Sequence, residues 1–240
     1  MATKVDPSPW LRDGEEKRES VRDMFADIAP TYDRVNSLMS FRLHYSWRAK
    51  AVKSLGLQQG DSALDVCCGT GDFLIPLRSA VGPSADVVGV DFCAPMLKVA
   101  AEKRNVQASL TVADACALPL RSEKFEGVTI GWGLRNVPSV ESALLEIFRV
   151  LKPNGRFVSL DMARPKGAFG AFSEKVFHSV VPLLGGLFGK REAYTYLPKS
   201  TVRFLSPQDL AHTLAELGFE DVWFKPMFFG NIGMVGGKKP

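Results

Sequence analysis

The stretch LDVCCGTGDF, residues 64–73, runs from apolar residues into a glycine-rich turn and leaves it through an acid. Residues 62–67 predict a buried strand, and residues 71–80 predict the helix that follows it. In open α/β sheets, ligands bind beyond the carboxyl ends of the strands, which is where such a turn lies. The identity of the ligand held here therefore decides which kind of α/β protein this is.

Strands and helices continue to alternate after the glycine turn. Further strands are predicted at 86–91, 110–113, 127–131 and 156–161, with helices at 94–105 and 140–151 and a turn at LKPNG, residues 151–155. This order predicts βαβ units in a doubly wound, mostly parallel sheet. A helix over 207–217, capped by Ser206 and ended by Gly218, and a hairpin of 219–225 with 231–235 complete the pattern.

The predicted organisation is one domain with additions at both ends. Residues 1–14 form a loose tail, 15–57 a helical lid interrupted at Pro30, 58–165 a cofactor-binding core, and 166–240 substrate-side helices and closing strands. The 240 residues are 46% hydrophobic and 23% charged, which is typical of a globular protein. A net charge of +4 without dense basic clusters argues against a nucleic-acid partner. The four cysteines have no metal-binding spacing, and the cytoplasm is the expected location.

Three ligands compete for the glycine turn. A triphosphate requires GxxxxGK[ST], which the sequence lacks. A dinucleotide requires GxGxxG, but Leu74 stands where the third glycine should be, after Gly69 and Gly71. S-adenosylmethionine has no phosphate, and a carboxylate suits its cationic amino group. Asp65, four residues before Gly69, supplies one, so the turn favours S-adenosylmethionine.

Acids at the next two strand ends support the same cofactor. Asp91 ends the second strand, where a carboxylate can accept both ribose hydroxyls, although this feature alone does not separate the cofactor from NAD. Asp114 and Ala115 follow the third strand, where they can meet an adenine edge. The alternative is that these turns merely cap helices. The predicted cofactor-binding residues are Asp65, Gly69, Thr70, Gly71, Asp91, Asp114, Ala115 and Gly131.

Three further blocks resemble a known family, the ubiquinone/menaquinone biosynthesis C-methyltransferases (UbiE/MenG). IAPTYDRVNSLMSFRLHYSWR, residues 28–48, is similar to the N-terminal signature of the family. GLRNV, residues 133–137, matches its segment after the fourth strand, and RVLKPNGRFVSLDMARP, residues 149–165, is similar to its second signature. In that signature Asn154 replaces a glycine, a mild change in a turn because asparagine tolerates a left-handed backbone. Asp161 replaces a glutamate and is shorter by one methylene.

The resemblance implies a class I S-adenosylmethionine-dependent methyltransferase with a Rossmann-like fold. The expected reaction is methylation of a polyprenylated demethylquinol at a ring carbon, and SFRLHYSWR, residues 40–48, favours the menaquinone branch. The alternatives are a methyltransferase for another lipid or small molecule, and a non-catalytic subunit of a quinone-synthesis complex. A nucleic-acid methyltransferase is a further alternative. Base-modifying enzymes of this fold often carry [DNS]PP[YFW] after the fourth strand, whereas this chain has IGWGLRNV, residues 130–137, so the sequence argues against it.

Carbon methylation of a quinol requires a deprotonated hydroxyl, and a free phenol has a pKa of about 10. Arg135 follows the fourth strand and is the candidate for stabilising the phenolate or orienting a water. His44 and Asp33 are candidates for removing the proton. The alternative for His44 is a hydrogen-bonded helix residue. For Asp33 it is a helix cap or an ion-pair partner of Arg34 or Arg48.

The apolar segment 169–188 is the expected contact for the isoprenoid tail. It predicts an interfacial segment at the inner face of a membrane, with peripheral attachment. Equally, it could pack on the sheet or form a homodimer interface.

Overall fold

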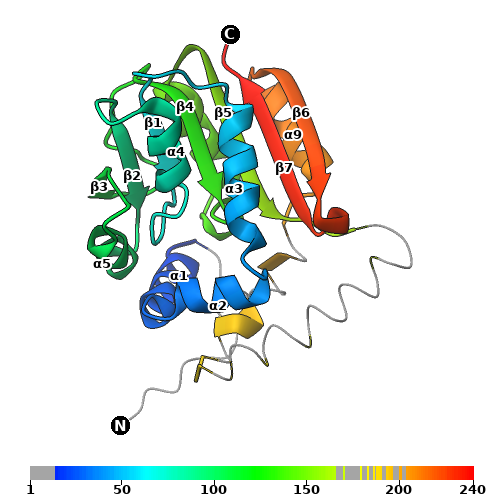
Figure 1. The fold of residues 1–240 in the computed structure, drawn as a ribbon. Coiled ribbons are helices and arrows are strands. Elements are labelled where there is room, and N and C mark those ends of the chain that lie inside the picture. Colours follow the sequence, from blue (N-terminus) through cyan, green and yellow to red (C-terminus); the bar gives the residue numbers. More distant parts are fainter. Residues whose placement is uncertain are drawn as a thin grey trace.

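A seven-stranded sheet forms the centre of the computed structural model, which describes residues 14–165, 170, 179, 183, 186, 188–190, 193–196, 200–201 and 204–240 (Figure 1). The strands are β1 (Ala63–Val66), β2 (Val87–Asp91), β3 (Ser109–Val112), β4 (Phe125–Gly131), β5 (Leu151–Met162), β6 (Glu220–Met227) and β7 (Ile232–Lys238). Their order is β3-β2-β1-β4-β5-β7-β6. The first five are parallel, and β7 pairs antiparallel with both β5 and β6. The predicted doubly wound sheet and closing hairpin are confirmed.

Helices cover both faces of the sheet. The helices are α1 (Gly14–Ile28), α2 (Tyr32–Met39), α3 (Leu43–Ser54), α4 (Leu74–Val81), α5 (Ala94–Glu102), α6 (Val140–Val150) and α9 (Pro207–Glu216), with short 3-10 turns η2 (Leu134–Asn136) and η3 (Phe228–Gly230). Side chains of α6 and α9 share one apolar core with the sheet, and those of α3 and α4 share the other. Ser206 caps α9 as predicted, accepting the Asp209 amide at 3.2 Å.

Strand β1 shows why the sheet can be read from the sequence. All four of its residues are buried, as expected for a central parallel strand. Leu64 and Val66 enter the core beneath α6 and α9, whereas Ala63 enters the core beneath α3 and α4. This alternation follows from the two-residue repeat of a strand and places Asp65 on the α3 and α4 side.

The predicted turn at LKPNG needs correction. Strand β5 begins at Leu151, which pairs with Phe125, and the next pair is Gly127 with Arg156. The intervening residues therefore form a bulge inside the strand rather than a connection before it. Asn154 adopts φ +65° there and its amide donates to the Lys239 carbonyl at 2.9 Å, so its predicted left-handed conformation is confirmed.

The glycines of β7 explain the unusual composition of the C-terminal tail. A Cβ at Gly236 would lie 2.5 Å from the Trp223 ring, and one at Gly233 would lie 2.6 Å from Pro207. The strand therefore lacks side chains where β6 and α9 approach it.

The predicted lid divides into two parts. Helices α1 and α2 lie beneath the edge of the sheet formed by the carboxyl ends of the parallel strands, whereas α3 runs along the face of the sheet (Figure 1). Most of the apolar segment 169–188 lies outside the described residues. Among the described helices, none combines the length and apolar character needed to cross a bilayer.

Candidate active site

A cavity opens at the carboxyl ends of β1, β2 and β4, beneath the helical lid. Five of the eight predicted cofactor-binding residues line it: Gly69, Asp91, Asp114, Ala115 and Gly131. The opposite wall comes from the lid, through Arg18, Phe25 and Tyr32. The strand ends and the helices α1 and α2 thus enclose one cavity.

The glycine turn bends sharply because several of its residues are left-handed. Gly69 has φ +54° and Gly71 has φ +83°, and Cys67 adopts φ +55° although it carries a side chain. Gly71 does not line the cavity. A Cβ there would come within 3.0 Å of Val106, so this glycine allows the turn to pack closely on the segment after α5. Its role in the described structure is therefore one of packing.

Asp91 is the best-positioned carboxylate for a ribose. Its Oδ2 accepts the Gly69 amide and its Oδ1 accepts the Cys93 amide, each at 2.8 Å. Burial raises the pKa of Asp91 to about 6, so the group is ionised at neutral pH. Each oxygen keeps a lone pair for a further hydrogen bond, which is what two vicinal hydroxyls require.

Asp65 does not line the cavity. Only 1% of its surface is exposed, and its Oδ1 accepts a hydrogen bond from Thr129 Oγ1 at 2.7 Å. Burial raises the pKa of Asp65 to about 8 despite that bond. The Arg48 cation also opposes the shift but does not cancel it. The contact of Asp65 with a cofactor amino group stays a prediction.

Asp114 and Thr70 tie the lid to the strand ends. Asp114 lines the cavity, accepts the Cys116 amide at 2.8 Å and forms an ion pair with Arg18 of α1 at 3.5 Å. Thr70 is buried and donates to Oδ1 of Asp33 in α2 at 2.6 Å. Thr70 therefore contacts the lid and is not among the residues that line the cavity.

Arg135 forms a buried ion pair with Asp161. Its Nη1 donates to Asp161 Oδ1 and, at 3.1 Å, to the Trp132 carbonyl, and its Nε donates to Ser200 Oγ at 3.3 Å. Asp161 also accepts the Met162 amide through Oδ1, and its Oδ2 is buried without a hydrogen-bond partner. Burial raises the pKa of Asp161, although the Arg135 cation opposes that shift. Asp161, which is one methylene shorter than the glutamate of the family signature, thus holds the Arg135 guanidinium in place.

His44 is buried against Arg48. Because a guanidinium has only donors, Arg48 Nη1 donates to His44 Nδ1, which leaves the proton on Nε2, where it contacts Ser37 Oγ at 3.3 Å. Burial, and then the Arg48 cation, lower the pKa of His44 to about 4. Both ring nitrogens are occupied and the ring is neutral at pH 7. These contacts favour the hydrogen-bonded helix residue over the proton acceptor.

Asp33 belongs to an ion-pair cluster between lid and turn. Lys103 Nζ lies 2.6 Å from Asp33 Oδ2 and 2.9 Å from Asp72 Oδ1. Asp72 Oδ2 lies 3.7 Å from both His44 Nδ1 and Arg48 Nη1. The cluster therefore joins α2 and α3 to the turn and to the end of α5, and it favours ion pairing for Asp33. The predicted arginine partners are replaced by Lys103.

Residues that the sequence reasoning did not single out complete the site. Asp72 and Lys103 hold the cluster, and Trp132 lines the cavity with φ +54°, its ring 4.6 Å from the Arg48 guanidinium carbon. For Asp72 the sequence carried one usable signal, an acid directly after the glycine turn. No sequence signal pointed to Lys103, because its partners Asp33 and Asp72 lie far from it in the sequence.

Comparisons with known proteins show which chains this one is similar to. A family model described as the ubiE/COQ5 methyltransferase family matches residues 12–239. The chain is 40% identical over 236 residues to the demethylmenaquinone methyltransferase of Desulfitobacterium hafniense, covering 95% of this chain and 92% of that protein. It is 41% identical over 232 residues to that of Anoxybacillus flavithermus, covering 94% and 98%. A solved S-adenosylmethionine-dependent methyltransferase of Thermotoga maritima has the same fold, with a TM-score of 0.67 at 20% identity and coverage of 92% and 100%.

Proposed function

Because the chain belongs to the ubiE/COQ5 methyltransferase family, we propose that it transfers the methyl group of S-adenosylmethionine to a ring carbon of demethylmenaquinol. The observation that carries the proposal is identity of about two residues in five, over nearly the full length, to relatives named for that reaction. The acceptor is a polyprenylated quinol, and the product belongs to quinone biosynthesis.

The residues at the cavity fit S-adenosylmethionine. This cofactor supplies an electrophilic methyl group on a sulfonium. Asp91 is fixed by two backbone amides and can accept the ribose hydroxyls, while Asp114 and Ala115 line the wall assigned to the adenine. Beneath the turn, Asp65 is a buried acid that a bound cation would favour in its ionised form, because opposite charge stabilises the carboxylate.

Arg135 is the residue we assign to the acceptor. A quinol hydroxyl ionises at a pKa of about 10, so a nearby cation is needed to hold the phenolate at neutral pH. The ion pair with Asp161 and the hydrogen bonds to the Trp132 carbonyl and Ser200 Oγ together limit the motion of the guanidinium. Arg135 is buried and does not itself line the cavity, but its neighbours Trp132 and Asn136 do, and this supports its assignment to the acceptor side of the site.

The helical lid excludes water from the cavity and helps to orient the reacting groups. Phe25 and Tyr32 close the cavity from the side opposite the strands, so the reacting groups are held in a largely apolar enclosure. His44 and Asp33 serve in this account to dock the lid through Arg48, Lys103 and the turn, and they leave proton removal to water beside Arg135.

We further infer that the protein works in the cytoplasm at the inner face of a membrane, because its acceptor carries an isoprenoid tail. A homodimer through the segment 169–188 is the remaining expectation from the sequence. Sedimentation of the protein at several concentrations tests it.

The test of the function is direct product identification. The protein is incubated with S-adenosylmethionine labelled in its methyl group and with reduced demethylmenaquinone, a demethoxy-type benzoquinol analogue, or no acceptor. Label in menaquinol at the ring carbon supports the proposal. Label only in the benzoquinol product, or cofactor binding without transfer to either quinol, overturns it.

A further inference from the structure

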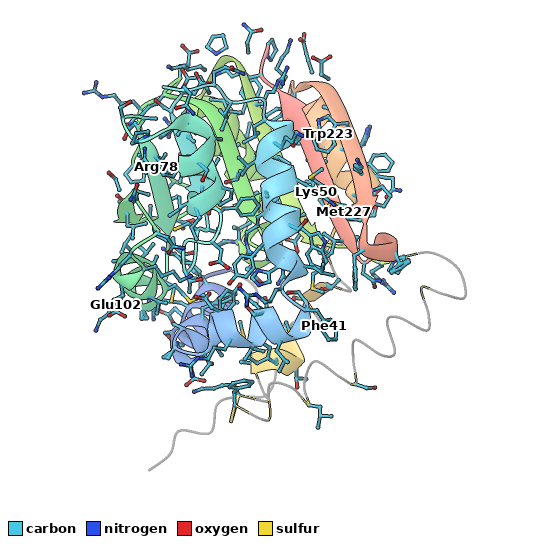
Figure 2. The ribbon with its side chains drawn as sticks, in the orientation of Figure 1. Phe41, Lys50, Arg78, Glu102, Trp223 and Met227 are labelled. Carbon is cyan, nitrogen blue, oxygen red and sulfur yellow. The ribbon has the colours of Figure 1, made fainter. Side chains whose placement is uncertain are left out.

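Two turns from distant parts of the sequence expose phenylalanines on one side of the molecule. Phe41 lies between α2 and α3, and Phe228 and Phe229 form η3 between β6 and β7. Phe41 is 81% exposed and Phe229 is 77% exposed. The Trp47 ring of α3, the helix that follows Phe41, lies 5.3 Å from the Phe228 ring, and Figure 2 shows Phe41 and Met227 on the same side of the molecule. We call Phe41, Phe228 and Phe229 the aromatic rim.

The backbone of the aromatic rim is unfavourable for residues with large side chains. Phe41, Phe228 and Phe229 have φ of +48°, +47° and +55°, a left-handed conformation that bulky residues rarely adopt. Glycine or asparagine would adopt it more readily. Conformations of this kind concentrate at functional surfaces, where the cost is offset by what the side chain contacts.

Basic side chains without acidic partners lie near the aromatic rim. Arg42 is exposed beside Phe41, and Lys50, Lys53 and Lys225 line a groove between α3 and β6 together with Trp223 and Met227. None of these four cations forms an ion pair with any part of the chain that the structure describes. Residues 41–54 and 222–240 contain no aspartate or glutamate. Figure 2 shows Trp223, Lys50 and Met227 following one another along α3 toward Phe41.

We propose that the aromatic rim and this basic groove dock the protein on an anionic lipid bilayer. Phenylalanine rings enter the boundary between headgroups and acyl chains, while lysine and arginine bind the anionic headgroups. A second copy of the chain is disfavoured as the occupant, because the uncompensated cations would face one another in a symmetric contact.

The position of the surface suits the acceptor. Ile232, directly after η3 and Asn231, pairs with Met162 at the carboxyl end of β5, so the rim lies at the edge of the sheet where the cavity opens. The other turn, at Phe41, follows α2, which carries the cavity residue Tyr32. The inference rests on the proposed function in this respect, since a polyprenylated quinol must leave a bilayer to reach the cavity.

Vesicle flotation of the full chain tests the inference. Vesicles of phosphatidylglycerol with phosphatidylcholine are compared with phosphatidylcholine alone, at low and high salt. We expect binding to the anionic vesicles only, weakened by salt. Phe41→Asn with Phe229→Asn keeps a residue that tolerates the left-handed backbone and should weaken binding about tenfold per ring removed. Phe224→Asn is the matched control, since Phe224 is exposed on the opposite face of β6.

A second set of variants tests how much the groove lysines contribute to vesicle binding. Lys50→Glu, Lys53→Glu and Lys225→Glu together should weaken binding by about fivefold per cation or more. Lys98→Glu, Arg104→Glu and Arg121→Glu together impose the same change of net charge on exposed residues outside the groove, and should leave most of the binding intact.

Three outcomes would overturn the inference: no binding of the wild type to anionic vesicles at low salt, unchanged binding of the rim and groove variants, or loss of a dimer in those variants on sedimentation. Methyl transfer to a short-tailed quinol in solution is measured in parallel. Absence of transfer by the wild type refutes the proposed function separately. If the rim variant transfers methyl groups to the short-tailed quinol as fast as the wild type does, its substitutions have removed only docking.

Discussion

Replacing Lys103 by methionine should loosen the lid, because this lysine holds two carboxylates together. Its Nζ lies 2.6 Å from Asp33 and 2.9 Å from Asp72. The Asp72 side chain is only 5% exposed and its Oδ2 accepts no hydrogen bond, whereas the Lys103 side chain is 21% exposed. Removing one partner of a fully buried pair costs about 3–5 kcal/mol. Partial exposure and the remaining Arg48 reduce the expected loss to about 2 kcal/mol.

A double-mutant cycle gives the assay. Lys103→Met, Asp33→Asn and the double variant are compared by urea unfolding and by calorimetric titration with S-adenosylmethionine. If Asp33 and Lys103 act as a pair, the losses in unfolding free energy should be non-additive by about 1 kcal/mol. Cofactor affinity should fall in all three variants, because Phe25 and Tyr32 of the lid form one wall of the cavity.

The same variants separate docking from proton transfer. Loss of a general base reduces turnover by about 10²–10⁴-fold. Should Asp33→Asn lose turnover to that extent while keeping stability and cofactor affinity, and Lys103→Met lose none, the docking role would be refuted and Asp33 would be the base.

Three further changes test the site. Arg135→Ala should lower kcat about a hundredfold with little change in cofactor affinity; steady-state kinetics and calorimetry measure both. Adding Asp161→Asn, which removes the unpaired buried acid, separates lost catalysis from unfolding, and unimpaired turnover would contradict the assignment. Because burial raises the pKa of Asp65 from 3.8 to about 8, folding favours its protonated form, so its contribution to stability is full below about pH 4, falls as pH rises toward 8, and is lost above pH 8. The advantage of Asp65→Asn over the wild type in urea unfolding without cofactor should therefore grow between about pH 4 and pH 8 and level off above it; an equal difference at all pH values would argue against the shift. Gly131→Ala would place a Cβ 2.4 Å from the Phe73 ring and should cost about 1–3 kcal/mol in thermal unfolding. Phe73→Leu should restore part of that loss, and failure to do so would show that the contact is not its cause.

Local patterns sufficed for the sheet and for the edge where the cavity lies. Buried strands such as β1 are short, mostly apolar runs, and glycine turns with acids mark where they end, so neighbouring residues alone identify them. Capping of α9 by Ser206 follows from the same short-range chemistry. Asp91, Asp114 and Gly131, which were predicted from strand ends alone, line the cavity, whereas Asp65, Thr70 and Gly71 of the first turn do not.

The roles of charged side chains were decided by tertiary structure, since each depends on a partner distant in the sequence. The sequence by itself determined the fold, the family and the edge of the sheet at which the cavity lies. It did not determine that Asp33 meets Lys103, that Arg135 meets Asp161, or that Asp65 is buried against Thr129. Electrostatic energy and pKa depend on distance and burial in space. A carboxylate therefore acts as a ligand, a base or an ion-pair partner only once the packed helices and strands have set its neighbours.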